Sequence, residues 1–266
     1  MPIAENGNDN AEYTIGFCYY KGQGVERNLG EAEKWLKKSI EQGNKAAEKA
    51  YGNLCEERRI LTFMYLLKHA NEGDVEAQYR LGGSYFCGYG TEKNEAEAIK
   101  WWKIAAENGY ALAQYDLGVA YESGTWVEQS NEQAMKWYLL AAEQGDAFAL
   151  YGVADYYYEG YIVEKNYEKA IELYRESAKR GYHRAQYNLG IIYYNGEGVE
   201  KNPSKAASWF KLAANQGHPQ AQYNLGALYY NGDGVERDLD EAKKWFRLAA
   251  DNGDLRAKDF FEGTIS

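Results

Sequence analysis

Proline, cysteine and methionine are scarce in this sequence, with three of each among 266 residues. Scarce proline leaves long stretches free to form helices, because proline removes a backbone donor and interrupts a helix interior. The cysteines Cys18, Cys55 and Cys87 form neither a CxxC pair nor an even disulfide framework. We therefore expect three free thiols, in or near the core of a protein from a reducing compartment.

Long apolar runs and excess positive charge are also missing. No stretch approaches 18 apolar residues, so we expect no membrane-spanning helix. Residues 1–10 are polar and lack an apolar signal core, which favours a cytoplasmic location. The net charge is −10, with 30 basic and 40 acidic side chains. This excess argues against a nucleic-acid partner, whose phosphates require lysine and arginine, and favours basic or neutral partners.

Glycine and tyrosine are abundant, with 28 and 26 copies, and the glycines reveal a repeat. One series has a spacing of 36 residues: Gly73, Gly109, Gly145, Gly181, Gly217 and Gly253. The hexapeptide at 185–190 returns at 221–226, and close copies occupy 77–82 and 113–118. A fixed period of this length is typical of a solenoid of stacked repeats.

Each repeat is expected to contain two helices, which we call helix A and helix B. In the copy at 218–253, helix A covers about 221–230, and helix B carries Ala242, Trp245 and Ala249 at helical spacing. Tryptophans recur at the helix B anchor and are expected in the core: Trp35, Trp101, Trp137, Trp209 and Trp245. The expected N-caps of helix B are Asn28, Asn94, Ser130, Asn166, Asn202 and Asp238. Capping boxes are completed three residues later by Glu31, Glu97, Gln133 and Glu241.

The sequence therefore predicts an all-α solenoid of helix-turn-helix repeats with a 36-residue period. A single repeat domain is expected over 9–262, between a polar tail at 1–8 and a short tail at 263–266. Its units are 9–43, a shortened 44–73, 74–109, 110–145, 146–181, 182–217 and 218–253, with a closing helix at 254–262.

The unit resembles the Sel-one-like repeat (SLR), a relative of the tetratricopeptide repeat. The residues that carry the resemblance are Ala221, Leu225, Gly226, Tyr229, the loop 232–235, Ala242, Trp245, Ala249, Ala250 and Gly253. The glycine-rich loop between the helices distinguishes the unit from a tetratricopeptide repeat. The resemblance implies a right-handed superhelix and a role as an adaptor or scaffold in a protein complex.

Two kinds of departure interrupt the pattern. The unit at 44–73 is six residues short, and its two expected helices, 46–55 and 61–70, are joined by 56–59 without a glycine loop. Two other loops replace their second glycine with Trp126 and Ile162. Because these residues are poorly suited to positive φ, we expect both loops to turn differently.

Positions that vary between repeats are free of architectural duty, so they indicate a candidate binding surface. In helix A, positions 3, 6 and 10 after the recurring alanine vary and form one stripe. The stripe would lie on the concave face. Its candidate partner-binding residues are Arg80, Asp116, Val119, Asp155, Glu159, Asn188, Ile191, Asn195, Asn224 and Asn231. A merely solvated groove is the alternative.

Nothing in the sequence indicates catalysis, a cofactor or a metal. His183 and His218 open helix A in consecutive units and are expected to be neighbours, with capping or surface roles. The expected function is therefore non-enzymatic binding of a protein or peptide. The alternatives are an immunity protein that neutralises a toxin, self-association through the open ends near Phe17, Tyr20 and 260–261, and a β-lactamase-like or other hydrolase. Some SLR proteins carry a cysteine pair in every repeat and bind β-lactams, and that pattern is absent here.

Overall fold

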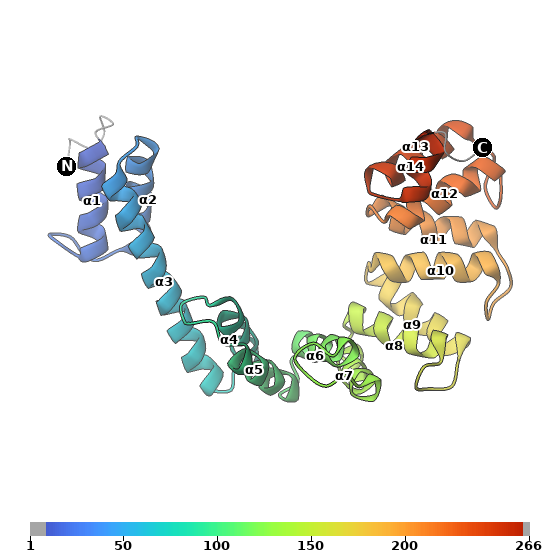
Figure 1. Ribbon diagram of the computed structural model, residues 1–266, viewed down its shortest axis with the longest axis horizontal. Helices are drawn as coiled ribbons and strands as arrows, with labels where there is room; N and C mark the ends of the chain where they lie inside the picture. The colour runs from blue at the N-terminus through green and yellow to red at the C-terminus, as the bar shows by residue number, and fades with distance from the viewer. Residues whose placement is uncertain (1–8, 263–266) are drawn as a thin grey trace. The chain divides into compact units, whose positions relative to one another are not determined.

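Helices make up the regular structure of the part of the chain that the computed structural model describes, residues 9–262, with side chains to residue 258 (Figure 1). They are α1 Asp9–Lys21, α2 Leu29–Glu41, α3 Lys45–Asn71, α4 Val75–Cys87, α5 Glu95–Glu107, α6 Ala111–Ser123, α7 Asn131–Glu143, α8 Ala147–Glu159, α9 Tyr167–Lys179, α10 His183–Asn195, α11 Pro203–Asn215, α12 Pro219–Asn231, α13 Leu239–Asp251 and α14 Leu255–Glu262. The expected all-α repeat architecture is confirmed. Between residues 9 and 262, no helix combines the length and apolar character that crossing a membrane requires. The expected tails at 1–8 and 263–266 lie outside the described residues.

The chain folds into two compact units, one ending at Ala105 and the other beginning at Ala106. In the first unit, α1 pairs with α2, α2 packs on α3, and α3 packs on α4. In the second unit, helices A and B pair as α6 with α7, α8 with α9, α10 with α11, and α12 with α13. Each pair packs on the next through α7–α8, α9–α10 and α11–α12, which produces a stack of helix pairs.

The shortened unit differs from the expectation. The two helices expected at 46–55 and 61–70 form one continuous helix, α3, of 27 residues. The linking residues 56–59 are two glutamates and two arginines, which propagate a helix well, and no glycine ends it there. Arg58 pairs with Glu33 of α2, and Glu57 pairs with Arg27 in the loop before α2, so two of the four linking residues tie α3 to neighbouring segments.

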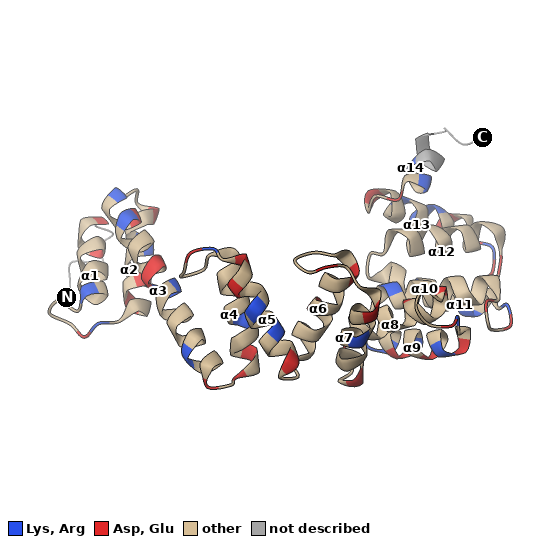
Figure 2. Ribbon diagram, turned by 60° about the horizontal axis from the view of Figure 1, so that its bottom comes forward, with Lys and Arg blue, Asp and Glu red and all other residues tan. Residues whose placement is uncertain are grey.

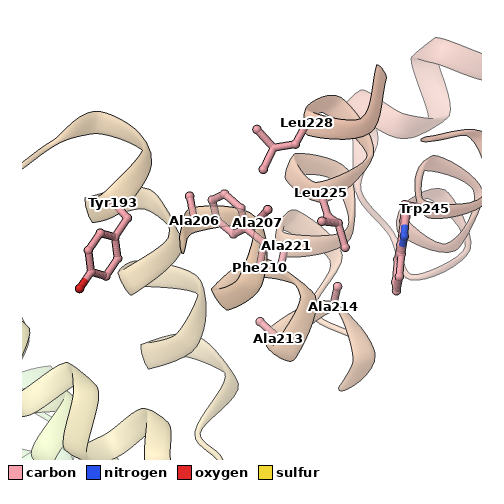
Figure 3. Packing of buried hydrophobic residues seen from close by; sticks show 10 residues of the cluster. All are labelled: Tyr193, Ala206, Ala207, Phe210, Ala213, Ala214, Ala221, Leu225, Leu228 and Trp245. Carbon is pink, nitrogen blue, oxygen red and sulfur yellow. The ribbon is translucent and has the colours of Figure 1, made fainter. Parts of the chain in front are cut away.

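Helix B buries its aromatic anchor one position later than expected. Trp101 and Trp245 are buried as predicted, but the other three tryptophans of the series are only half-buried. The residues one position later are at most 4% exposed: Leu36, Tyr138, Tyr174, Phe210 and Phe246. Phe210 lies among the alanines of α11 and α12, which Figure 3 shows.

This anchor explains the recurring glycine in the middle of helix A. A Cβ atom placed on Gly118 would lie 2.4 Å from the ring of Tyr138, and one on Gly190 would lie 2.5 Å from Phe210. Real Cβ atoms do not approach other atoms so closely, so these repeats require glycine where helix A meets the anchor of helix B. The α8–α9 repeat instead has Ala154 at this position, buried in one cluster with Tyr174.

The N-caps of helix B form as predicted, whereas the capping boxes do not. All six predicted caps accept a backbone N–H bond two or three residues later, as Asn202 does from Lys205 at 2.9 Å. A capping box also needs the cap's own N–H, and this donor is already used. The N–H of Asn202 donates to the carbonyl of Tyr193 at 2.7 Å, and the other five caps repeat this bond to the equivalent tyrosine.

The two loops with replaced glycines behave differently from each other. Trp126 adopts a φ of 66°, and among residues 9–262 it is the one non-glycine residue with positive φ. The expectation of a different turn is therefore wrong for Trp126, which keeps the conformation of the glycine it replaces. Ile162 does not take positive φ, so its loop does turn differently, and its side chain packs on the core of α7 and α8.

Glutamine side chains link successive repeats of the second unit. Gln186 at the start of α10 donates to the carbonyl of Ala178 at the end of α9 (3.2 Å) and accepts from Gln216 at the end of α11 (2.8 Å). The repeats beginning with α6 and α12 form the same pair of bonds. The repeat of α8 and α9 has Leu150 and Arg180 at the two glutamine positions, so this amide ladder is interrupted there.

Two adjacent glycines of α4, Gly82 and Gly83, allow the effect of close packing and the effect of helix propensity on stability to be measured separately. A Cβ on Gly82 would lie 2.5 Å from the Trp102 indole and 3.0 Å from a backbone oxygen, whereas one on Gly83 would meet nothing within 4 Å. We expect Gly82→Ala to destabilise the protein by about 1–3 kcal/mol through overpacking. Gly83→Ala should stabilise it by about 0.5–1 kcal/mol, because alanine favours helix. Chemical denaturation followed by circular dichroism measures both, and equal shifts would contradict this explanation.

The loops at Trp126 and Ile162 give a second matched pair. We expect Trp126→Gly to raise the free energy of unfolding by about 1 kcal/mol, because the left-handed conformation costs other residues about this much. Ile162→Gly should lower it, because the side chain packs on the core and its φ does not call for glycine. The melting temperatures of both variants check this pair, and a Trp126→Gly variant less stable than the natural chain would refute the first half.

Candidate binding site

The candidate stripe residues lie on helix A of five repeats, and the structure brings some of them together in two hollows. Asp155, Glu159 and Asn188 line one hollow, and Ile191 borders both. Asn195, Asn224 and Asn231 line the other with Ile191. Asp116 and Val119 on α6 line neither of these two hollows. Arg80 belongs to the first unit, on α4, where it pairs with Glu76 at 3.4 Å.

The first hollow, which we call the tyrosine pocket, has a volume of about 310 Å³. It is lined by Glu122, Tyr151, Asp155, Tyr156, Tyr158, Glu159, Tyr161, Tyr174, Asn188 and Ile191. These residues come from α6, α8, α9, α10 and the loop after α8. The pocket therefore combines five tyrosines and three carboxylates on one repeat and its neighbours.

Asp155 is the central polar group of this pocket. The hydroxyl of Tyr174 donates to its carboxylate, and the amide of Asn188 approaches the same oxygen at 3.5 Å. That amide also donates to the hydroxyl oxygens of Tyr174 at 3.3 Å and Tyr151 at 3.4 Å. The network fixes the orientation of the carboxylate and of the two tyrosines around it.

Burial raises the pKa of Asp155 to about 6. The hydrogen bonds from Tyr174 and Tyr151 act in the opposite direction, and the charges of Glu122 and Glu159 add to the rise. Burial also raises the pKa of Tyr174 and of Tyr151 above the ordinary range, so both remain neutral donors near pH 7. A carboxylate with a raised pKa in a cleft is typical of a functional site.

The second hollow, the asparagine pocket, has a volume of about 290 Å³ and is richer in apolar and amide groups. Beside the three stripe asparagines and Ile191, it is lined by Tyr187, Tyr194, Phe210, Ala227, Leu228 and Arg256. Arg256 lies over the ring of Tyr223 at 4.0 Å and pairs with Asp254 at 2.7 Å, so its charge is already partnered.

Sequence reasoning missed the tyrosines of the first pocket and Glu122. Tyr151 has a counterpart in every full-length repeat, and its recurrence assigned it to the architecture. It does pack on Tyr174, with ring centroids 5.7 Å apart, but it also lines the pocket. Glu122 occupies a position that is Tyr or Phe in the other full-length repeats, so comparison at this position would have found it.

The two histidines are neighbours as expected, and His218 has the expected capping role, whereas His183 neither caps α10 nor lies at the surface, because its Nδ1 is buried without a hydrogen-bond partner. Their rings are neighbours, with centroids 5.2 Å apart, and His218 caps α12 by accepting the N–H of Ala221 at 3.3 Å. Burial and the nearby charges of His183 and Arg184 lower the pKa of His218 to about 4, so it is neutral at pH 7.

The expectation of self-association loses one of its residues. Tyr20 is 5% exposed within the core of α1, α2 and α3. Of the two residues expected at this end, Phe17 alone is partly accessible. Phe260 and Phe261 lie outside the described side chains. Pairing through the ends stays a prediction.

The raised pKa of Asp155 predicts a pH-dependent stability. Between about pH 4 and pH 6 the native protein binds a proton at Asp155 that the unfolded chain has lost. The free energy of unfolding therefore falls as the pH rises across this range, and the loss is complete above it. We expect Asp155→Asn to increase the free energy of unfolding by about 1–2 kcal/mol at pH 8, with no gain at pH 4. Denaturation curves across this range test it. Glu164→Gln, at an exposed residue outside the pocket, is the control and should change little, and a gain for Asp155→Asn that does not vary with pH would contradict the assignment.

Comparison with known proteins identifies the repeat. The Sel1 repeat model matches residues 10–44, 75–110, 111–146, 147–182, 183–218 and 219–254, and it leaves out the segment that contains α3. The chain is similar to a protective antigen of uropathogenic Escherichia coli with an SLR fold, with a TM-score of 0.70, 32% identity and coverage of 96% of this chain and 56% of that one. It is also similar to a Sel1 repeat protein from Oxalobacter formigenes, with a TM-score of 0.70, 31% identity and coverage of 98% and 78%.

Similarity to curated sequences is more local. DAP3-binding cell death enhancer 1 of Rattus norvegicus is 49% identical over 45 residues, which is 17% of this chain and 9% of the relative. An uncharacterized protein of Neisseria meningitidis is 30% identical over 113 residues, which is 41% of this chain and 23% of the relative. The chain thus spans less than a quarter of either curated relative. Its six matched repeats and its helix-pair stack place the chain in the Sel1 repeat family.

Proposed function

We propose that this protein is a non-enzymatic scaffold that binds a polypeptide segment along the helix A face of α8, α10 and α12. The observation that carries the proposal is the convergence of seven variable stripe residues on two adjoining hollows that share Ile191. Family membership supports it, because Sel1 repeat proteins are protein-interaction scaffolds. The toxin-neutralising alternative is a narrower form of the same role and stays a prediction.

The chemistry of this face suits a peptide main chain. The side-chain amides of Asn195, Asn224 and Asn231 offer both donors and acceptors, which an extended peptide requires. Ile191 supplies an apolar contact between the two hollows. Both hollows have the size of sites that hold a few side chains.

Charge favours a neutral or basic partner. The A helices of the second unit, α6, α8, α10 and α12, carry four acidic residues and one basic residue, Arg184. In Figure 2, α10 and α12 are accordingly almost free of charge colour, whereas α9 carries both signs. Nucleic acid, which needs a basic surface, does not fit this face.

Peptide selection on the immobilised full chain tests the proposal. Peptides selected from a random linear library should lose about 3–10-fold in affinity with Asn195→Ala or Asn231→Ala, because one hydrogen bond contributes about 0.5–1.5 kcal/mol. The matched control is Asn215→Ala, which removes an exposed asparagine at the end of the B helix α11 and should change nothing. Failure to select any peptide, or equal losses in all three variants, would refute binding on the helix A face.

A further inference from the structure

The carboxylates of the tyrosine pocket are departures from the repeat. The position of Asp155 is Phe, Gly, Val, Ile or Ala in the other full-length repeats, and that of Glu159 is Lys, Cys, Ser or Asn. Glu122 belongs to the preceding repeat, at a position that is Tyr or Phe in the other full-length repeats. Three acidic residues thus replace non-acidic ones in two consecutive repeats, and all three line one pocket. The repeat fold does not require this convergence, since its other copies form without it.

The pocket holds negative charge without a cation. No Lys, Arg or His is among its lining residues, and within residues 9–258 none of its three carboxylates takes part in an ion pair. Elsewhere in the chain, Glu33 and Glu176 pair with lysine and arginine side chains. Burying Asp155 without a counter-charge is unfavourable, and a bound cation would offset this cost.

The tyrosines add a second attraction for a cation. Three pairs of rings have centroids between 5.7 and 6.4 Å apart: Tyr151 and Tyr174 at 5.7 Å, Tyr158 and Tyr174 at 6.1 Å, and Tyr156 and Tyr161 at 6.4 Å. Aromatic faces attract organic cations. The chain already uses this contact, as Lys165 over Tyr167 and Arg256 over Tyr223 show. Among the described side chains, no cation of the chain lies over a tyrosine of the pocket.

We propose that the tyrosine pocket binds the charged end of a lysine or arginine side chain of the partner polypeptide. The cation would lie against Asp155 and Glu159, with tyrosine rings around its methylene groups. This inference rests on the proposed function for its partner, whereas the choice of a cation rests on the pocket alone. The acidic side chains between residues 9 and 258 do not form a metal-ligand cluster, which favours an organic cation over an inorganic one.

Three short peptides test the charge requirement on the full chain. The probes are acetyl-Ala-Lys-Ala-amide, its arginine analogue and its norleucine analogue, which keeps the chain length but has no charge. We expect at least one cationic peptide to shift the NMR signals of the Asn188 side-chain amide and the Ile191 methyl groups saturably, and the norleucine peptide to bind at least about tenfold more weakly. Equal binding of charged and neutral peptides, or no shift with any of them, would overturn the proposal.

Substitutions in the pocket test whether the cation binds beside Asp155 and Glu159. The double variant Asp155→Asn and Glu159→Gln should lose about tenfold or more in affinity for the cationic peptide, and its circular dichroism should match that of the natural chain. The control Glu164→Gln removes a charge from the loop of the same repeat, at an exposed residue outside the pocket lining, and should bind normally. Affinity should also fall as salt rises, because screening weakens charge pairs. Equal losses in the control and the double variant would refute the site.

The outcomes separate this proposal from the scaffold proposal. If library peptides bind the helix A face but tolerate replacement of every Lys and Arg by Gln, only the cation pocket is refuted. If tetramethylammonium and the cationic peptides shift Asn188 while no library peptide is selected, the pocket binds cations and the scaffold role is refuted.

Discussion

The close contact between a small residue of helix A and the buried anchor of helix B recurs through the repeats, with glycine in most of them and Ala154 in the α8–α9 repeat. In the second unit, Gly118, Gly190 and Gly226 let the rings of Tyr138, Phe210 and Phe246 lie almost against a helix backbone. This approach sets the distance between the two helices of a pair, and interiors packed so densely tolerate little change. The bond from the N–H of the helix B cap to a tyrosine carbonyl of helix A recurs beside this contact and joins the same two helices a second time.

Much of this architecture could be predicted because local signals repeat with a fixed period. The caps were found correctly, since their chemistry depends on one side chain and the next turn. The capping boxes were not, because the N–H of a cap such as Asp238 donates instead to a carbonyl nine residues earlier in another helix, that of Tyr229. The fusion of two helices into α3 was also missed, because the expectation of a pair came from its neighbours and not from the helix-favouring residues 56–59.

The site was only half visible in the sequence. Variation between repeats located Asp155, Glu159 and Asn188, which line the tyrosine pocket. Since the residue type at these positions differs between repeats, the repeat fold does not determine it, and another role is indicated. The same logic excluded Tyr151, since a residue present in every copy counts as architecture. One side chain can belong to the core along one edge and to a pocket along the other. That dual role appears only when the helices are placed together.

The interruption of the amide ladder at Leu150 and Arg180 affects cooperativity. In a repeat array, stability is a sum of terms for each repeat and for each interface with a neighbour. The α10–α11 and α12–α13 repeats each have both bonds of the ladder. In the α8–α9 repeat, Leu150 and Arg180 remove the bond from α8 back to α7 and the bond within the repeat, and only the bond from Gln186 to Ala178 remains. The raised pKa of Asp155 lowers the stability of this repeat further above pH 6. The contact between α7 and α8 therefore lacks the glutamine bond that joins the other successive repeats, and we expect local unfolding of the second unit to begin there. A partner bound there would contact the repeats on both sides and would make their unfolding more cooperative.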